Sequence, residues 1–205
     1  NITNSLTWTE TNSGSETFSN GLKVLNLKRR KNKVITTRII PPIQYVVTTS
    51  KKYISATTET IYIGTNWGLC YYNSEEDNFR VETSVGAMIS ITDIYEDSHN
   101  NLWIATANNG IFYNNRKDNY WKHYEHKQGV NTSLSSNSIV TLFEDSKQKI
   151  WLGTNGNGLC QFNPQTETFT TFNSNNKQLS TLVVYSIEQD FQVIYGLPVT
   201  SVWPK

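Results

Sequence analysis

The sequence predicts an all-β fold in which a unit of four short strands recurs along the chain. Alanine is scarce, whereas Asn, Thr, Ser, Tyr and Ile are plentiful, and this mixture favours strands and turns over helices. One short segment rich in Trp and Gly recurs, and an apolar stretch ending in an acidic residue precedes it. Apolar residues also run or alternate over about four to six positions between clusters of Asn, Gly, Ser and Asp, as in short strands.

The recurring segment carries a shared glycine in each copy. Successive shared glycines lie 47, 42 and 48 residues apart, and self-similarity at a period of about 20–50 residues marks repeat architectures. The shared glycines are Gly21, Gly68, Gly110 and Gly158. The copies read GLKVLN (Gly21–Asn26, partial), IYIGTNWGLCYYN (Ile61–Asn73), LWIATANNGIFYN (Leu102–Asn114) and IWLGTNGNGLCQFN (Ile150–Asn163).

A second shared element lies upstream of the glycine segments, and an aromatic strand lies downstream. SITDIYED (Ser90–Asp97) matches SIVTLFED (Ser138–Asp145), and VVYSIEQD (Val183–Asp190) is a third version. IQYVVTTS (Ile43–Ser50) is a degenerate fourth. The downstream aromatic strands are expected at Phe79–Val81, Tyr120–Tyr124 and Phe169–Phe172.

Each unit is therefore predicted to hold four strands. In one unit they are Ile91–Tyr95, Leu102–Thr106, Gly110–Tyr113 and the aromatic strand Tyr120–Tyr124. Four strands at a period of about 40–50 residues, with a Trp-Gly signature, are typical of a β-propeller blade. The predicted blade units are roughly 1–40, 41–86, 87–133 and 134–180, with the start of a further blade at 181–190 and an aberrant tail at 191–205.

Three positions of the repeat can be assigned a structural role. An aspartate ends the first strand, where its side chain can bond the backbone of the following turn. A tryptophan, replaced by Tyr62 in the earlier unit, occupies the second strand, where a large ring can pack between sheets. A glycine restarts the chain after a tight hairpin. Recurrence favours a structural role over a catalytic one for these residues, which are Asp97, Asp145, Asp190, Trp103, Trp151, Gly110 and Gly158.

The stretch LSSNSIVTLFEDSKQKIWLGTNGNGLCQFNPQTETFTTF (Leu134–Phe172) resembles the two-component-regulator propeller repeat. That repeat reads Leu-Ser-x-Asn, then an apolar strand ending in Glu-Asp, then Leu-Trp-Ile-Gly-Thr, then Gly-Leu-x-x-(Tyr/Phe)-(Asn/Asp). The resemblance extends from about Asn20 to Asp190. It implies the periplasmic sensor region of a hybrid two-component histidine kinase of Bacteroides-type bacteria, in which a bound oligosaccharide switches on genes for polysaccharide degradation.

The resemblance also implies how many blades and which further domains a complete protein of this family has. In the family the propellers usually have seven blades and are followed by a β-sandwich domain, a membrane helix, a kinase and a response regulator. This chain has room for about four blades, holds none of those domains, and has no apolar run of the roughly 18 residues that a membrane helix needs. We therefore expect a partial propeller, a fragment of a larger sensor that is not itself an enzyme. Because an unclosed propeller exposes two sheet edges, closure by self-association is an alternative.

After Asp190 the repeat predicts a further Trp-bearing strand, but the sequence reads FQVIYGLPVTSVWPK. A back-translation of Gln192 to Lys205, with one base restored in the first codon, reads Gly-Asn-Ile-Trp-Leu-Ala-Ser-Asn-Leu-Gly-Leu-Ala-Lys. That reading supplies the missing second and third strands in register. We hypothesise a single-base frameshift, natural or from a sequence error, and a diverged final strand is the alternative.

A ligand site is expected at the loops that join second and third strands, because in propeller geometry these loops share a face with the connections between blades. Their side-chain amides are of the kind that bind sugar hydroxyls, and one indole could supply a stacking face. The candidate ligand-binding residues are Asn66, Trp67, Asn108, Asn109, Asn155 and Asn157. The alternative is that Asn and Gly here simply satisfy hairpin geometry.

Other kinds of site receive little support. The net charge of +1 argues against nucleic-acid binding, and the run KRRKNK (Lys28–Lys33) is interpreted as a solvated turn. None of the three histidines is spaced with cysteines or carboxylates as zinc ligands are, so no metal or cofactor is expected. Cys70 and Cys160 occupy the same position in units separated by one blade, which predicts two free thiols.

Two other classes of protein remain open from the sequence. A sialidase-like glycan-processing enzyme is one, because the Asp-x-x-x-Asn-x-Trp turn resembles the Asp-box turns of those propellers. The pairs Glu96-Asp97 and Glu144-Asp145 would then be candidates for acid–base work, although they end strands and the chain has only five arginines to grip a substrate carboxylate. A protein-interaction propeller of the WD-repeat kind is the other, and its Trp-Asp and Gly-His signatures are absent.

Overall fold

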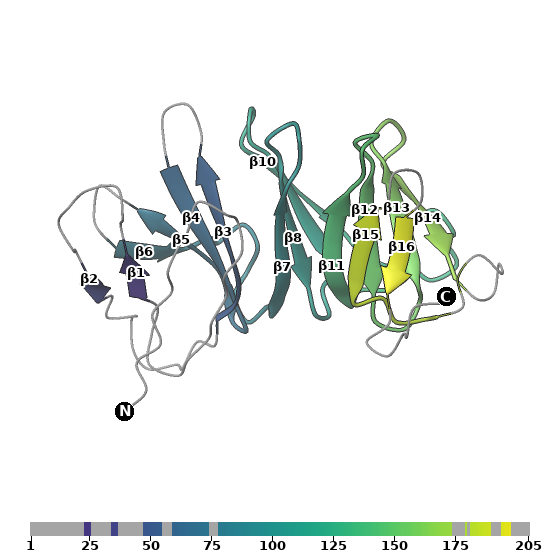
Figure 1. Ribbon diagram of the computed structural model, residues 1–205, viewed down its shortest axis with the longest axis horizontal. Helices are drawn as coiled ribbons and strands as arrows, with labels where there is room; N and C mark the ends of the chain where they lie inside the picture. The colour runs from purple at the N-terminus through teal and green to yellow at the C-terminus, as the bar shows by residue number, and fades with distance from the viewer. Residues whose placement is uncertain are drawn as a thin grey trace. The chain divides into compact units, whose positions relative to one another are not determined.

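The computed structural model shows an all-β chain and describes residues 23–25, 34–36, 47–54, 59–73, 78–173, 179, 181–189 and 194–197 (Figure 1). The chain divides into two compact units, Asn1–Ile89 and Ser90–Lys205. Every strand pairing within them is antiparallel. The part of the chain that is described contains no helix, and thus none that is long and apolar enough to cross a membrane.

The first unit holds one four-stranded sheet and one strand pair. The sheet has the order β3-β4-β5-β6, so strands adjacent in sequence are adjacent in the sheet. Its strands are β3 (Val47–Ile54), β4 (Glu59–Thr65), β5 (Gly68–Asn73) and β6 (Asn78–Val81). The separate pair consists of β1 (Lys23–Leu25) and β2 (Val34–Thr36).

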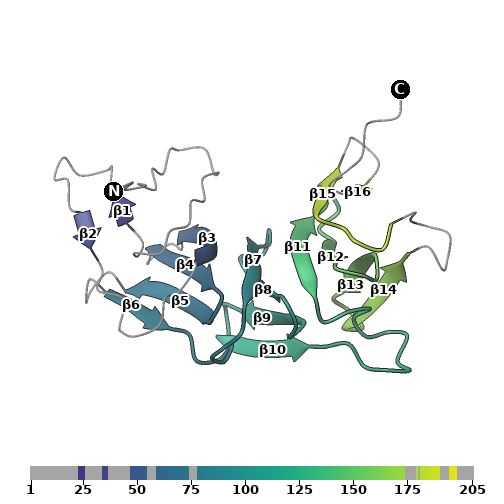
Figure 2. The ribbon, with the colours of Figure 1, turned by 90° about the horizontal axis from the view of Figure 1, so that it is seen from below.

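The second unit holds two four-stranded sheets of the same up-and-down order and a further strand pair. Figures 1 and 2 place β11 beside β7, with β10 and β14 as the outermost strands of their sheets. One sheet consists of β7 (Ile91–Glu96), β8 (Leu102–Thr106), β9 (Ile111–Asn115) and β10 (Tyr120–Tyr124). The next consists of β11 (Ile139–Glu144), β12 (Ile150–Thr154), β13 (Leu159–Asn163) and β14 (Thr168–Phe172), and the pair is β15 (Ser186–Gln189) with β16 (Ile194–Leu197).

The predicted fold class, all-β with blades of four antiparallel strands, is confirmed. β8 and β10 have the predicted bounds, but β9 begins at Ile111 rather than Gly110, because Gly110 has a φ of 67° and stands outside the extended region. Most of the predicted first blade and Asp190 lie outside the described residues. Within the tail that was predicted to be aberrant, Ile194–Leu197 pairs with β15 at the place of a second strand, and the frameshift stays a hypothesis.

The core of the second unit lies between its two sheets. All five residues of β8 and all five of β12 are buried, whereas the outer strand β10 has none in that class. The Trp103 ring lies 4.5 Å from the Tyr113 ring of its own unit and 5.1 Å, edge-on, from the Phe162 ring of the next sheet. The tryptophan ring therefore packs between sheets, as its place in the repeat predicts.

The turn after β7 is organised by the carboxylate of Asp97, which is only 7% exposed. Its Oδ1 accepts hydrogen bonds from the backbone N–H groups of His99 and Asn101, at 3.0 and 2.8 Å. Its Oδ2 accepts from the Asn101 side chain at 3.0 Å and from the indole Nε1–H of Trp103 at 2.8 Å. One carboxylate thus closes the turn and satisfies a donor that burial would otherwise leave unpaired.

The same device recurs after β11. Asp145 Oδ1 accepts from the backbone N–H groups of Lys147 and Lys149, at 2.8 and 2.9 Å, and its Oδ2 accepts from Trp151 Nε1 at 2.9 Å. Residues at matching places in the two turns, Asn100 and Gln148, have φ values of 63° and 62°. The turn is therefore a property of the repeat.

A second contact joins consecutive units of the repeat at this end. Glu144, the residue before Asp145, accepts from the backbone N–H and the hydroxyl of Ser98 in the preceding sheet, at 2.8 and 2.6 Å. Gln189 bonds Ser146 in the same two-point way, at 2.7 Å to the backbone N–H and 2.8 Å from its own amide to the hydroxyl. We call this contact the serine clasp. Of the pair Glu144-Asp145, the aspartate therefore bonds within its own sheet and the glutamate bonds the preceding sheet.

We expect Asp145→Ala to lower the free energy of unfolding by about 3 kcal/mol. The substitution leaves the Trp151 indole N–H buried without an acceptor and removes two bonds from the turn backbone. Urea denaturation monitored by tryptophan fluorescence measures the change. Asp118→Ala, an exposed aspartate, serves as control and is expected to change stability by less than about 0.5 kcal/mol. A loss no larger than the control's would show that the carboxylate does not hold the turn.

We expect Glu144→Gln to preserve the serine clasp and Glu144→Ala to lose it. Gln189 already forms the equivalent contact with Ser146, so an amide fits this geometry. Because Ser98 is exposed, the loss on Glu144→Ala is expected to be about 1 kcal/mol in the same urea experiment. Equal losses for the two variants would indicate that the negative charge, and not the hydrogen-bond geometry, carries the contact.

Candidate functional site

The hairpins that join second and third strands are closed by a threonine in all three four-stranded sheets. The hydroxyls of Thr65, Thr106 and Thr154 donate to the carbonyls of Gly68, Gly110 and Gly158, each at 2.8 Å. The same hydroxyls accept from the backbone N–H groups of Trp67, Asn109 and Asn157. This threonine was not among the predicted residues, although it recurs at the start of each Asn- and Gly-containing loop and its recurrence indicates a structural role.

In the second unit, both hairpins are bonded to a connection between sheets. Gly110 N–H donates to the carbonyl of Asn137 at 2.8 Å, and Gly158 N–H donates to that of Leu182 at 2.7 Å. The side-chain amide of Asn157 donates to the carbonyl of Ser135 at 2.6 Å. The two hairpins therefore meet the same connecting segment, residues 134–138, and share one end of the unit with it. In the first unit, Trp67 accepts from the backbone N–H of Met88 at 3.0 Å.

The six candidate ligand-binding residues differ in exposure and in the hydrogen bonds that they already make within the protein. Asn108 and Asn155 are exposed, and their side-chain amides make no hydrogen bond to the described part of the chain. Asn157 is tied to Ser135, and Asn109 is held by its backbone. Asn66 and Trp67 are half-buried in the hairpin of the first unit. Exposed, unoccupied amides at this end of the second unit are thus contributed by Asn108 and Asn155.

Two histidines brace the same end of the second unit. The ring nitrogen Nε2 of His123 lies 2.6 Å from the carbonyl of Asn109, and the ring stacks on Phe112 with centroids 4.1 Å apart. His126 bonds the connecting segment twice, through Nδ1 to the carbonyl of Leu134 and through its backbone N–H to Asn137 Oδ1, both at 2.6 Å. These rings fix loop carbonyls, and spacing in the sequence gave no sign of that role.

Both cysteines are free thiols, as predicted. Burial raises the pKa of the Cys70 thiol above its ordinary value. Cys160 is fully buried, with its sulfur 3.1 Å from the Ser135 hydroxyl. Among the described residues, no group of three His, Cys, Asp or Glu side chains lies close enough together to hold a metal ion.

We expect Gly158→Ala to destabilise the protein far more than Gly156→Ala in the same hairpin. Both glycines have positive φ values, 80° and 111°, so each substitution carries a backbone cost of about 1–2 kcal/mol. A Cβ at Gly156 meets nothing within 4 Å, whereas one at Gly158 would lie 2.4 Å from the Phe172 carbonyl oxygen. Unfolding in urea measures both, and similar losses would contradict a steric role for the shared glycine.

The comparisons with known proteins agree with this repeat. The family model described as "Two component regulator propeller" matches residues 86–108 and 133–156, which contain β7 and β8 and then β11 and β12 with the turns that join them. No curated protein sequence matches the chain significantly.

Solved structures from the bacterium B. thetaiotaomicron share the fold. The extracellular domain assigned to a hybrid two-component system has a TM-score of 0.58 and 17% identity over 67% of this chain and 20% of that one. The domain assigned to a one-component system has a TM-score of 0.59 and 24% identity over 85% of this chain and 23% of that one. A further extracellular domain, also assigned to a hybrid two-component system, has a TM-score of 0.52 and 19% identity over 85% of this chain and 30% of that one.

At these identities the likeness shows the fold, and this chain spans 20–30% of the length of those domains. The family match covers the aspartate turns, the tryptophan strands and the hairpin threonines Thr106 and Thr154, and it ends before Gly110 and Gly158. The chain therefore matches the two-component regulator propeller model over two stretches, which fall in the first halves of the two four-stranded sheets of its second unit.

Proposed function

We propose that this chain is part of the extracytoplasmic, periplasmic sensing propeller of a hybrid two-component system, and that it binds an oligosaccharide to control polysaccharide-utilisation genes. The observation that carries the proposal is the hairpin end of the second unit. There, the exposed amides of Asn108 and Asn155 stand on hairpins fixed by threonine and glycine bonds. An amide offers both a donor and an acceptor, which is the pairing that sugar hydroxyls require.

The location and the signalling role are supported by the comparisons. The similar solved structures are extracellular domains of two-component and one-component systems. Because those proteins are much longer than this chain, the control of gene expression is proposed for the whole protein to which these repeats correspond.

The hydrogen bonds of the acidic residues support a binding role rather than a catalytic one. Asp97 and Asp145 are each bonded to an indole and a turn backbone, and Glu144 is bonded to Ser98. A general acid or base needs a proton-accepting oxygen that can reach the substrate. These carboxylates instead stabilise the blade, so we propose that the chain is not itself an enzyme.

We expect a matching oligosaccharide to raise the thermal midpoint of the full chain in a glycan-panel thermal-shift assay. A ligand at about a hundred times its Kd stabilises by about 2.7 kcal/mol, or roughly 5–10 °C for a chain of this size. The double variant Asn108→Ala, Asn155→Ala is expected to lose most of the shift. Lys147→Ala, an exposed side chain in the Asp145 turn at the other end of the sheet, should keep it.

Two results would contradict the proposal. One is the absence of a shift with every glycan of a panel covering neutral and acidic plant and host polysaccharides. The other is turnover, in which the glycan is cleaved by the chain and the cleavage is abolished by Glu144→Gln.

A further inference from the structure

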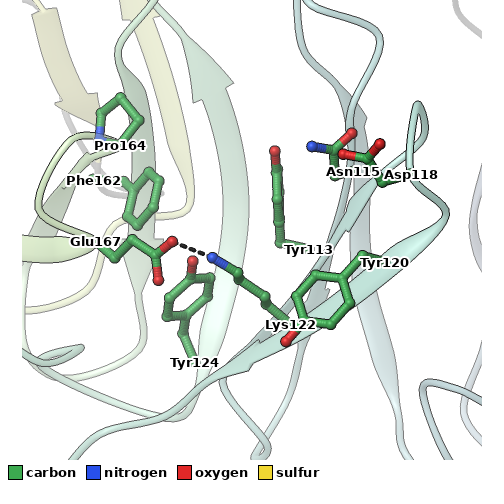
Figure 3. A pocket seen from close by; sticks show the side chains of 9 residues that line it. All are labelled: Tyr113, Asn115, Asp118, Tyr120, Lys122, Tyr124, Phe162, Pro164 and Glu167. Atoms are coloured by element: carbon green, nitrogen blue, oxygen red, sulfur yellow. Dashed lines mark hydrogen bonds and ion pairs between the residues drawn. The ribbon is translucent and has the colours of Figure 1, made fainter.

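A hollow of about 580 Å³ lies at the rim of the second unit, between its two four-stranded sheets (Figure 3). β9, β10 and the turn between them form one side, and the β13–β14 turn forms the other. Because successive turns of an antiparallel sheet alternate between its ends, these two turns lie at the end opposite the Asn-Gly hairpins. We call this hollow the rim pocket.

The lining of the rim pocket combines ring faces with hydrogen-bonding groups. Tyr113, Tyr124 and Phe162 supply aromatic surface from the two sheets, and Tyr120 is the most accessible ring, with 57% exposure. In Figure 3 Asn115 and Asp118 stand near the tyrosine rings on one side of the hollow, and Glu167 stands on the other.

Charge within the rim pocket is partly neutralised across the two sheets. The Lys122 ammonium reaches from β10 to form an ion pair with Glu167 of the next sheet, and it lies 6.0 Å from the centroid of the Tyr120 ring. With Asp118, the lining carries two carboxylates and one ammonium. The excess of negative charge disfavours an anionic ligand.

Two tyrosine hydroxyls of the rim pocket, those of Tyr113 and Tyr124, stay protonated. Burial raises the pKa of Tyr113 and of Tyr124, and the negative charge of Glu167 adds to the rise in both. The Tyr124 hydroxyl is already hydrogen-bonded to Glu167, and the Tyr113 hydroxyl can act as a donor or an acceptor at any physiological pH.

The blade does not require an aromatic or charged side chain at every position of the rim pocket. Tyr113 pairs with Lys122 across β9 and β10, and at the equivalent pair of the next sheet Gln161 stands opposite Thr170. Tyr120 pairs with Asn115, and its counterpart Thr168 pairs with Asn163. The next sheet thus forms with small or neutral residues at the positions that match Tyr113, Tyr120 and Lys122.

The β13–β14 turn also holds Glu167 in an unfavourable backbone conformation. Glu167 has a φ of 53°, and the matching residue of the β9–β10 turn is Asn119, with a φ of 47°. Asparagine tolerates this left-handed region better than glutamate does. A glutamate here brings its carboxylate to Lys122 at the pocket, which an asparagine could not do over the same reach.

We propose that the rim pocket binds one ring of a neutral sugar, stacked on Tyr120 with its hydroxyls bonded to Asp118 and Glu167. A pyranose has apolar C–H faces and a polar periphery, so it matches an exposed ring flanked by carboxylates and an amide. The volume falls within the range of about 300–1,000 Å³ that small-molecule sites occupy. The ligand class rests on the proposed function, whereas the site is distinct from the hairpin end.

The test is isothermal titration of the full chain with neutral pentasaccharides of glucose, mannose, galactose and xylose, and with a pentasaccharide of galacturonate. We expect at least one neutral pentasaccharide to bind, and Tyr120→Ala and Asp118→Asn each to weaken it by about tenfold or more. Thr168→Ala, the matching position of the next sheet, is the control and should leave the Kd unchanged. The galacturonate chain should bind more weakly than the neutral ones.

The outcomes separate this proposal from the proposed function. Binding that is unchanged by Tyr120→Ala and Asp118→Asn but lost in the Asn108→Ala, Asn155→Ala variant would overturn the rim pocket and leave the sensing role intact. Preference for galacturonate would also overturn it, because the lining carries excess negative charge. Failure of every pentasaccharide to bind the unmodified chain would count against both proposals.

Discussion

A tryptophan indole that is buried between two sheets must find an acceptor for its N–H group, and the repeat is arranged around that requirement. Asp97 and Asp145 meet it for Trp103 and Trp151. Each aspartate can do so only if the first strand ends at that residue and the chain returns after a turn of fixed length. The other carboxylate oxygen, bonded to two backbone N–H groups, holds that turn. Strand length, turn conformation and ring position are thus coupled through one side chain.

The two four-stranded sheets of the second unit are joined by hydrogen bonds at both ends and along their first strands. The serine clasp places Glu144 on Ser98 at one end of the sheets, and the hairpin carbonyl and amide bonds join them at the other. Between these ends, Asp93 of β7 accepts from the backbone N–H of Leu142, and the Thr92 hydroxyl donates to the Ile139 carbonyl. A sheet of this kind buries its face only against a neighbour, as in other repeat proteins.

The sequence was sufficient to predict what depends on local pattern. Periodicity and turn chemistry within one unit predict the strand positions, the aspartate that directly follows β7 and β11, and the glycine after each hairpin. It did not predict contacts that need two sheets, because their partners lie far apart in sequence: Ser98 with Glu144, or Lys122 with Glu167. The sequence placed the candidate amides on the hairpins but did not show which of them the fold leaves exposed. Asn108 and Asn155 are exposed, but Asn157 is bonded to Ser135 from the connecting segment, which no spacing rule indicates. The rim pocket went unnoticed for the same reason, since its lining comes from strands of both sheets.

The serine clasp gives the repeat a direction. At two successive junctions of the second unit, a serine is bonded by a glutamate or glutamine of the sheet that follows it: Ser98 by Glu144 and Ser146 by Gln189. The junctions are consequently interchangeable modules. A further unit that carried the same serine and the same glutamate or glutamine could be inserted between two others, and each serine would still meet a carboxamide or carboxylate. The chemistry of the junction therefore sets the order and polarity of the blades but not their number, which must be decided by the angle between neighbouring sheets and by the closure of the ring.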